Sequence, residues 1–577
     1  MVTAGLTAFS VDDKLAMLEV ATEVTVDTEV DPLHGISVAF DGPAQGFYFP
    51  IAHAGNSNIN GNQRGKLYSL LASRDFLVFH NAVYDLRILA EAGLDYRGEF
   101  YDTMLMAHWI NEERYNYSLD TISKLYGGKP KEMPEFMKAI IENDGWDAVP
   151  ASLMDEYSAH DAFITHHLFR KLQPQFEEQN FAGDLWKTEQ KFIRDVMYPM
   201  MQLGIKADTS FSIREYMRGM AIMEECKKEL GFNPGSTKQL EKFLIDDLGL
   251  PVLARTPKGK PSFTKNEMEV YEVMLEHKKD KRASTILRYR GWQKATSSSY
   301  RPYIDLSGDD GVLHPGYKLH GTRTGRLSCE KPNLQQIPKS SDKDWNGNLK
   351  NAFVARPGFG LHTVDYSQLQ FRMTVAYAHA DTDCSDLLDV FNDPTRDIFT
   401  EMAKQMGWLR HNVKTLVYLI LFGGGATRAK FAFNLDTVEE GMVLVKEFHG
   451  LYPSIAKVAK KAENAARKQG HVTYWTGRRR HFPRGSAFYR AFNAVIQGGE
   501  AEIIKRAMIA LVEEVCDENC RILLQIHDEV VFEIREGMED EYLDKAQKVM
   551  ENAPKAFCDF VGVDIAFKTS RGKWGEK

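Results

Sequence analysis

The chain has 577 residues, of which 43% are hydrophobic and 26% charged, so it can bury more than one core. No stretch approaches the ~18 apolar residues of a membrane span, and we expect no membrane partner. The formal net charge of −8 argues weakly against a nucleic-acid partner, but basic residues cluster at 282–294 and 478–484. A basic run is usually a solvated surface, so motifs must decide what the clusters do.

Processing and redox features point to a cytoplasmic protein. The first residues lack a basic segment followed by an apolar one, so no secretory signal is expected. The six cysteines show no metal-ligand spacing, and reduced thiols in a cytoplasm are the simplest interpretation. Cys516 and Cys520 form a pair by spacing, but no second pair accompanies them, which argues against zinc.

The N-terminal third has an α/β pattern. Strand-like runs at 23–26 and 35–40 precede helical periodicity after Asn81, and residues 154–203 read as helical. Residues 233–236 (NPGS) predict the start of a helix near Thr237, and 257–261 (PKGKP) predict an exposed basic loop. Farther on, a turn at 306–311 precedes a strand at 361–364. Helices are expected over 383–468 and a β-hairpin over 521–534.

Acidic residues of the N-terminal third occur at spacings that bring them to one face. Residues two apart on a strand share a face, as do residues four apart on a helix. The pairs are Asp27 with Glu29, Asn81 with Asp85, and Tyr157 with Asp161. If the four carboxylates converge, each close pair repels by roughly 4 kcal/mol at an effective dielectric near 20. Such a cluster persists only with raised pKa values or bound cations.

This ordered set resembles the DEDD superfamily of 3′-5′ exonucleases, in the subtype with a tyrosine four residues before the last carboxylate. A single Asp-x-Glu on a strand is usually a solvated edge, but here every member of the set is present. The resemblance implies a ribonuclease H-like domain. It further implies that Asp27, Glu29, Asp85 and Asp161 are metal ligands and that Tyr157 orients the attacking water.

The C-terminal half has two prominent aspartates and one patterned helix. Asp365 ends an apolar strand, and His527-Asp528 occupies the tight turn of the expected hairpin, where rigid strands can hold a carboxylate. Between them, Arg410, Lys414, Tyr418 and Phe422 follow one another in steps of four and lie near one helical face. Cations followed by aromatic rings suit a triphosphate followed by a sugar and base. Each aspartate alone could equally be a turn former.

These segments resemble motifs A, B and C of the family A DNA polymerases. Three further segments resemble the family too, at 232–240 (FNPGSTKQL), 320–338 (HGTRTGRLSCEKPNLQQIP) and 493–508 (NAVIQGGEAEIIKRAM). The resemblance implies an exonuclease domain over 1–183 and a right-hand polymerase domain over 184–577. Within the latter it implies a thumb at about 209–300, a palm at about 301–384 and 486–577, and fingers at about 385–485.

The resemblance also implies residue roles. Asp365 and Asp528 would hold two Mg²⁺ ions in the polymerase site, and the exonuclease site would hold two Mg²⁺ ions of its own. Mn²⁺ would be able to substitute for Mg²⁺ in both sites. Lys414 would contact the α-phosphate and Arg410 the γ-phosphate, beside Tyr418, Phe422 and Gln370. His527 would lie at the primer terminus. The residues expected to contact the duplex minor groove are Arg326, Asn333, Gln335 and Gln497. A tyrosine hydroxyl at position 418 would replace the 3′-OH that a dideoxynucleotide lacks.

Three positions depart from the family pattern, which usually has Glu, Tyr and His where this chain has Gln370, Phe422 and Phe399. In the family the Glu and Tyr are hydrogen-bonded to each other. Here both partners differ, so the change does not leave one buried polar group without its hydrogen-bond partner. Gln370 keeps the length of Glu, so exclusion of ribonucleotides is expected to survive. Relatives of this family copy bacteriophage genomes in which 2-aminoadenine replaces adenine, and the resemblance leads us to the hypothesis that this chain, with its changed pocket, is one of them.

We therefore expect a replicative DNA polymerase with proofreading, acting as a monomer on primer-template DNA and dNTPs, most like those of bacteriophages and working in the host cytoplasm. No 5′-nuclease pattern precedes Asp27, and no long thumb insertion of the thioredoxin-binding type is evident. Two alternatives are less favoured, because the exonuclease set and the 320–338 segment argue against the first, and the intact Asp365, Asp528, Arg410 and Lys414 argue against the second. A single-subunit RNA polymerase shares the two palm aspartates, and a nuclease with a DNA-binding pseudo-polymerase would keep the fold without the synthesis.

Overall fold

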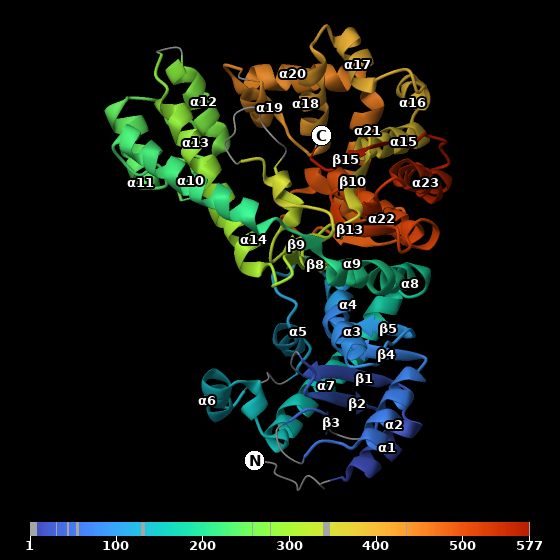
Figure 1. The fold of residues 1–577 in the computed structure, drawn as a ribbon. Helices are drawn as coiled ribbons and strands as arrows, with labels where there is room; N and C mark the ends of the chain where they lie inside the picture. Colours follow the sequence, from blue (N-terminus) through green and yellow to red (C-terminus); the bar gives the residue numbers. More distant parts are fainter. Residues whose placement is uncertain are drawn as a thin grey trace.

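The computed structural model describes residues 9–29, 32–42, 46–53, 57–128, 133–256, 258–276, 279–338, 347–433 and 435–575. In Figure 1 an N-terminal α/β part lies at the bottom, and a larger C-terminal part with three groups of helices and strands lies above it. None of the helices in these ranges is both long and apolar enough to cross a membrane.

The N-terminal part is built on a five-stranded sheet in the order β3-β2-β1-β4-β5. Its strands are β1 (Val24–Glu29), β2 (Gly35–Phe40), β3 (Phe47–Pro50), β4 (Phe76–Phe79) and β5 (Glu99–Asp102). Strand β1 is antiparallel to β2 and parallel to β4. Every residue of β2 is buried, because helices cover the sheet, and α7 packs along β1, β2 and β3. The helices are α1 (Val11–Val20), α2 (Gly61–Ala72), α3 (Ala82–Glu91), α4 (Thr103–Ile110), α5 (Leu119–Leu125), α6 (Glu135–Asp144) and α7 (Ala151–Glu178).

A short helical segment joins the two parts. It consists of α8 (Asp184–Lys191), the π-helical η2 (Phe192–Met197) and α9 (Tyr198–Leu203). The Trp186 indole nitrogen on α8 donates to the carbonyl of Phe100 at 3.0 Å, and η2 packs against α22 (Ala491–Glu514) of the C-terminal part. The junction is therefore packed on both sides.

The C-terminal part is centred on a four-stranded sheet in the order β13-β14-β10-β15. Its strands are β10 (Phe359–Tyr366), β13 (Cys520–Ile526), β14 (Glu529–Arg535) and β15 (Thr569–Lys573). The buried helix α22 and the helices α23 (Glu539–Asn552) and α24 (Lys555–Val561) accompany it. Three two-stranded antiparallel sheets complete this part: β6 (Ile205–Lys206) with β7 (Val312–Leu313), β8 (Gly316–Lys318) with β9 (Ser328–Glu330), and β11 (His471–Thr473) with β12 (Arg479–His481).

Two helical groups rise from this sheet on different sides (Figure 1). The first, green in the figure, contains α10 (Thr209–Leu230), α11 (Thr237–Glu241), α12 (Lys265–Glu276), α13 (Arg282–Ala295) and α14 (Arg301–Leu306), and α11 to α13 enclose a separate apolar core. The second contains α15 (Leu369–Asp381), α16 (Ser385–Asn392), α17 (Ile398–Met406), α18 (Arg410–Leu421), α19 (Ala426–Ala432), α20 (Val438–Leu451) and α21 (Pro453–Gln469).

Most expected elements are present, and two differ. The helical run expected over 154–203 is interrupted at residues 179–183, where the left-handed Asn180 and Gly183 turn the chain. Asn81 does not lie within a helix: it has φ 76° and precedes α3 as its N-cap. Of the expected basic loop at 257–261, Pro257 lies outside the described residues, while Lys258 and Lys260 are exposed.

Candidate functional site

Three of the four N-terminal carboxylates converge between a strand and a helix. Asp27 and Glu29 on β1 and Asp161 on α7 each offer an oxygen, and these oxygens lie within 4.8 Å of one another. The alternation of the strand puts both β1 carboxylates on the face that α7 covers. Oε1 of Glu29 is buried without a hydrogen-bond partner among the described residues. An arrangement of this kind suits a divalent cation, which prefers oxygen ligands.

The fourth carboxylate, Asp85 on α3, lies next to this group. Its Oδ1 accepts hydrogen bonds from Thr28, at 2.9 Å from the backbone nitrogen and 2.7 Å from the hydroxyl. Burial raises the pKa of Asp85 to about 8, and the negative charges of Asp102 and Glu29 add to this, although the two Thr28 bonds act in the opposite direction. Without a cation, ionisation of Asp85 is therefore unfavourable, and a bound cation would favour the charged form of the carboxylate.

Tyr157 and Asp161, one turn apart on α7, line a cavity of about 870 Å³. Its other walls come from α5 and α6 and include Ser118, Asp120 and Lys138. The cavity gives the carboxylates access to a ligand much larger than a metal ion.

The C-terminal aspartates lie close together, Asp365 on β10 and Asp528 in the turn between β13 and the adjacent strand β14. Asp365 on β10 is paired across the ladder with Glu529, and the Tyr366 backbone nitrogen donates to the carbonyl of Asp528 at 3.2 Å. His527 has φ 59°, the left-handed conformation that this tight turn requires. Burial raises the pKa of Asp528 to about 8, with further contributions from Glu500 and Asp365. Two facing carboxylates in a partly buried site again fit divalent cations.

Glu500 on α22 is a member of this site that the motif analysis missed. Its carboxylate accepts hydrogen bonds from Nε2 of Gln370 at 3.2 and 3.1 Å and is bonded to the guanidinium of Arg326. The segment 493–508 is among those that resemble the family, but its pattern does not single out Glu500, a charged residue within an otherwise apolar and small stretch. Such a residue needs partners when it is buried.

The stripe of side chains on α18 faces the same site. Phe422 is 37% exposed and stacks on Tyr418 with ring centroids 5.9 Å apart. Burial raises the pKa of Tyr418 to about 12, helped by the charges of Asp528, Glu500 and Asp365, so the tyrosine lies near the carboxylates. Arg410 and Lys414 are exposed at the other end of the stripe.

Phe399 on α17 contacts three side chains of this stripe, Arg410, Lys414 and Tyr418. It is fully buried, stacks on Phe371 and packs against Tyr418. The cationic groups of Arg410 and Lys414 lie 5.7 and 5.9 Å from its ring centroid, within the range of a cation–π contact.

Arg410 is also held by a carboxylate. It donates to both oxygens of Asp397 at 2.8 and 2.9 Å. The hydrogen bond to Arg410 is the main reason why the pKa of Asp397 is lowered to about 2. A ligand phosphate would therefore meet a guanidinium that is already oriented.

The residues expected near a duplex differ in what they offer. Asn333 is exposed, and Gln497 is half-buried on α22. Gln335 is buried, and its amide nitrogen donates to the side-chain oxygen of Gln525 at 2.8 Å. Gln525 in turn bonds to the carbonyl of His527. Gln335 therefore braces the turn that carries His527 and Asp528, a link that the sequence did not reveal.

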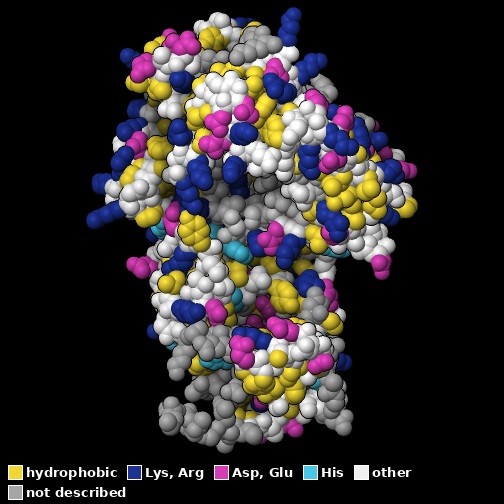
Figure 2. Space-filling view, turned by 90° about the vertical axis from the view of Figure 1, so that its left-hand side faces the viewer, with side chains coloured by type: hydrophobic (Ala, Val, Ile, Leu, Met, Phe, Trp, Pro, Cys, Tyr) yellow, Lys and Arg dark blue, Asp and Glu magenta, His cyan; other side chains and the backbone are white. Residues whose placement is uncertain are grey.

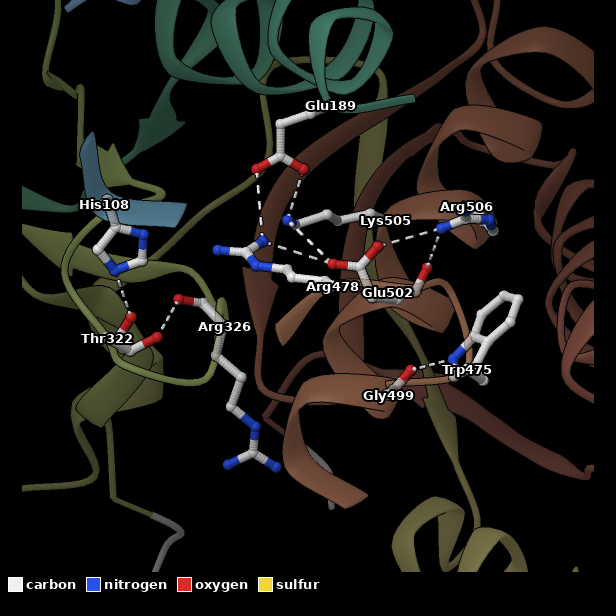
Figure 3. Close-up of polar contacts among 10 residues, drawn as sticks. All are labelled: His108, Glu189, Thr322, Arg326, Trp475, Arg478, Gly499, Glu502, Lys505 and Arg506. Atoms are coloured by element: carbon white, nitrogen blue, oxygen red, sulfur yellow. Dashed lines mark hydrogen bonds and ion pairs between the residues drawn. The ribbon is translucent and has the colours of Figure 1, made fainter. Parts of the chain in front are cut away.

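Two arginines of the basic cluster at 478–484, Arg478 and Arg480, are buried and do not lie on a solvated surface. Arg478 is 3% exposed and lies 3.5 Å from Glu502 and 3.8 Å from Glu189. Lys505 joins Glu189 at 2.6 Å (Figure 3). Arg480 pairs with Glu112 at 2.8 Å. These contacts link the C-terminal part to α8 and to the loop after α4.

Arg478 also fixes the loop that carries Arg326. Its guanidinium lies 4.5 Å from the ring centroid of Trp109 on α4. A Cβ on Gly325 would approach that guanidinium to 2.7 Å, and Gly325 has φ +81°, so only glycine fits here. Beside it, His108 bonds to the carbonyl of Thr322 at 3.0 Å (Figure 3).

The surface is hollowed across the upper half of the molecule (Figure 2), and Lys and Arg side chains gather along the rim of the hollow. A negative ligand can therefore approach a molecule whose net charge is negative.

Comparison with known proteins gives matches over almost the whole chain. Residues 211–576 match the model of DNA polymerase family A, and residues 6–177 match that of a 3′-5′ exonuclease. DNA polymerase I of Pseudomonas aeruginosa is 27% identical over 94% of this chain and 62% of its own length. The thermostable DNA polymerase I of Thermus thermophilus is 29% identical over 81% of this chain and 55% of its own length.

The chain thus spans less than two thirds of these curated relatives. Among solved structures, the POL domain of Pol1 from M. smegmatis, in complex with DNA primer-template and dNTP, superposes with a TM-score of 0.80. It is 22% identical, and the match covers 97% of this chain and 96% of that one. At this identity the likeness establishes the fold.

Proposed function

Because the chain belongs to DNA polymerase family A and carries a 3′-5′ exonuclease domain, we propose that it synthesises DNA on a primer-template and proofreads its product. The observation that carries this proposal is that Asp365 on β10 and Asp528 in the β13–β14 turn lie close together and near the Arg410–Phe422 stripe. The proposed domains are 1–183 and 184–577, with the latter divided into thumb, palm and fingers as expected from the motifs.

In the polymerase reaction the primer 3′ oxygen attacks the α-phosphate, and the bond to pyrophosphate breaks. Arg410, already oriented by Asp397, holds the γ-phosphate. Lys414 contacts the α-phosphate and donates a proton from Nζ to the leaving pyrophosphate. Tyr418 and Phe422 pack on the base and sugar beside Gln370. Arg326, Asn333, Gln497 and His527 contact the duplex near its terminus, while Gln335 acts through Gln525.

In the exonuclease reaction a water attacks the terminal phosphodiester and releases a nucleotide. Tyr157 orients this water, and the cavity beside Asp161 receives the 3′ end of a single strand. Asp27, Glu29, Asp85 and Asp161 would hold two Mg²⁺ or Mn²⁺ ions, as Asp365 and Asp528 would in the palm. When bound, such ions activate the nucleophile and stabilise the leaving oxygen.

The test is to disable each carboxylate set alone. Asp27→Ala with Glu29→Ala removes degradation of single-stranded 3′ ends and leaves primer extension nearly intact, whereas Asp528→Ala does the reverse. Loss of both activities from either change contradicts the two-site assignment. Extension assays with dNTPs and with rNTPs, each with and without Mg²⁺, separate a DNA polymerase from an RNA polymerase and from a pseudo-polymerase.

We further propose that the enzyme is a monomer, that it works in the cytoplasm of a host cell, and that its template is a bacteriophage genome containing 2-aminoadenine. Gln370 supports the proposal of 2-aminoadenine. The carboxylate of Glu500 can only accept hydrogen bonds, so the NH₂ group of the Gln370 amide faces Glu500. That leaves Oε1 of Gln370 as a buried acceptor without a partner among the described residues. An unmatched buried acceptor costs about 1–3 kcal/mol, and the 2-amino group of 2-aminoadenine is a minor-groove donor.

The measurement is a competition between dATP and 2-amino-dATP opposite template T, in exonuclease-deficient and proofreading forms. A preference for 2-amino-dATP in the exonuclease-deficient form is expected. Equal use of both nucleotides in both forms contradicts the proposal, and a preference confined to the proofreading form moves its cause from the pocket to the exonuclease.

A further inference from the structure

Glu500 is a buried carboxylate to which the proposed reaction gives no task. It lies on α22 with 2% of its surface exposed. A buried carboxylate is retained only where partners compensate for the loss of water. Its partners therefore indicate what the side chain does.

Both partners of Glu500 belong to the proposed polymerase site. Gln370 donates its two-hydrogen amide group to both carboxylate oxygens, at 3.2 and 3.1 Å. Arg326 is bonded to Oε2. Gln370 lies near the start of α15, just after Asp365, whereas Arg326 lies in the loop between β8 and β9. One carboxylate on α22 thus joins two segments that are far apart in the sequence.

The main chain of Arg326 is fixed independently of Glu500. Its carbonyl accepts the Thr322 hydroxyl at 2.7 Å, and Figure 3 shows its guanidinium pointing away from the cluster of Glu189, Arg478 and Lys505. The tip of the side chain is therefore left for Glu500 to orient. A cavity of about 30 Å³, lined by Arg326, Glu500 and His527 among others, adjoins them and has room for a water molecule.

A purely structural ion pair between α22 and the loop would account for Arg326 but not for Gln370. An uncharged amide adds nothing to charge compensation that a water could not supply. Its bidentate approach instead fixes which end of the amide faces Glu500, and hence where Oε1 points. The arrangement controls two side chains in the pocket at once.

We propose that Glu500 is a positioning residue for nucleotide selection. It holds Gln370 beside the incoming nucleotide and Arg326 beside the primer terminus. One carboxylate thus fixes the positions of the two side chains that would contact the nascent base pair and the primer end. This inference rests on the proposed DNA synthesis and deepens it.

A charge exchange between the two side chains tests the proposal. Glu500→Gln removes the charge that orients Arg326, and Gln370→Glu places two carboxylates in contact. Each should lower kcat/KM for single-nucleotide incorporation about 30-fold, as expected for loss of a charge-assisted hydrogen bond. The double variant, Gln370→Glu with Glu500→Gln, restores a contact between one carboxylate and one amide but leaves Arg326 without the charge of Glu500. Its kcat/KM should therefore fall about 30-fold, as in Glu500→Gln alone, and not by the product of the two single losses.

Two readouts separate positioning from folding. Glu500→Ala should impair both discrimination between deoxy- and ribonucleotides and discrimination between matched and mismatched primer termini. Gln370→Ala should affect mainly the first and Arg326→Ala mainly the second. Glu514→Gln, an exposed change on the same helix, should alter neither. Degradation of single-stranded 3′ ends by the same preparations reports that the chain is folded.

The outcomes are distinct. If the native chain does not extend primers, the proposed polymerase function fails. If it does, and Glu500→Gln keeps native kcat/KM and both discriminations, the positioning role is wrong. If the double variant shows only the product of the two single losses, Glu500 and Gln370 are not coupled and the proposal is likewise overturned.

Discussion

The hydroxyl of Tyr418 lies in a pocket of aromatic rings and carboxylates, and this environment keeps it protonated. Its ring is held between Phe399 and Phe422, with centroids 6.0 and 5.9 Å away. The hydroxyl is near Asp365, Glu500 and Asp528, whose charges help to raise the pKa of the phenol. A phenol kept protonated in this way is a hydrogen-bond donor at every physiological pH.

We predict that the native enzyme discriminates weakly against dideoxynucleotides and that Tyr418→Phe restores discrimination. The Tyr418 hydroxyl can replace the 3′-OH that such a nucleotide lacks by donating to its phosphate, and phenylalanine cannot. The measurement is the ratio of kcat/KM for dTTP and ddTTP in both forms, with exonuclease disabled by Asp27→Ala and Glu29→Ala.

Phe422→Tyr serves as a control, because it changes the neighbouring ring of the same stripe and leaves the Tyr418 hydroxyl in place. A native enzyme that rejects dideoxynucleotides by about 10³-fold or more, equivalent to roughly 4 kcal/mol, would show that the hydroxyl does not act in this way.

At the scale of elements, buried charged side chains hold the hairpin of β11 and β12 against α8 and α22. Arg478 precedes β12 and contacts Glu189 on α8, Glu502 on α22 and the ring of Trp109 on α4. Removing one member of a buried charged cluster leaves an uncompensated charge, which typically costs 3–5 kcal/mol.

Arg478→Ala is therefore expected to lower the free energy of unfolding by about 3 kcal/mol or more, measured as a shift of the urea midpoint at pH 7. Arg484→Ala is the matched control, since Arg484 belongs to the same basic run but is exposed, and its loss should change stability by less than about 0.5 kcal/mol. Equal effects of the two changes would mean that the buried cluster does not stabilise the junction.

The elements that the sequence could predict are those with local signals. The β2 strand was expected at residues 35–40 and occupies those residues, because a short apolar run between turns is a local pattern. The His527-Asp528 turn likewise follows from two alternating runs with a break between them. The tyrosine and aspartate of α7 share a face because four residues span about one helical turn.

What the sequence could not predict depends on contacts between distant segments. A basic run such as 478–484 usually lies on a solvated surface, but Arg478 is buried, because its partners Glu189 and Glu502 come from two other helices. Gln335 was expected to offer its amide to a duplex and instead donates it to Gln525. Glu500 lies in the family-like segment 493–508, but its part in the site becomes visible only in its bonds to Gln370 and Arg326.

At the scale of the whole molecule, the two parts share a charged junction rather than a loose linker. Glu112, in the loop after α4, accepts from the His481 backbone nitrogen and lies 2.8 Å from both Nη1 of Arg480 and Nδ1 of His481. Glu113 adds a contact to Arg480 at 2.5 Å. These bonds tie the loop after α4 in the N-terminal part to the same hairpin that Arg478 contacts.

The pH dependence of this junction can be predicted from Glu112. Burial acts to raise the pKa of Glu112, but His481 and Arg480 together outweigh it, so the pKa is lowered from its ordinary value of 4.5. A carboxyl whose pKa is lower in the folded than in the unfolded state stabilises the folded state above its unfolded pKa. That stabilisation is lost as the pH falls through the folded value.

Glu112→Gln should therefore be less stable than the native chain at pH 7, and the difference should shrink as the pH falls below about 4.5. The measurement is the urea midpoint of both proteins between pH 7 and pH 3, because carboxyls remote from Glu112 titrate alike in the two and cancel in the difference. Glu135→Gln, a change at an exposed position on α6 that contacts Lys138 within the N-terminal part, should show little difference at any pH. A difference between Glu112→Gln and the native chain that stays constant across this range would show that the charge of Glu112 does not stabilise the contact between the two parts.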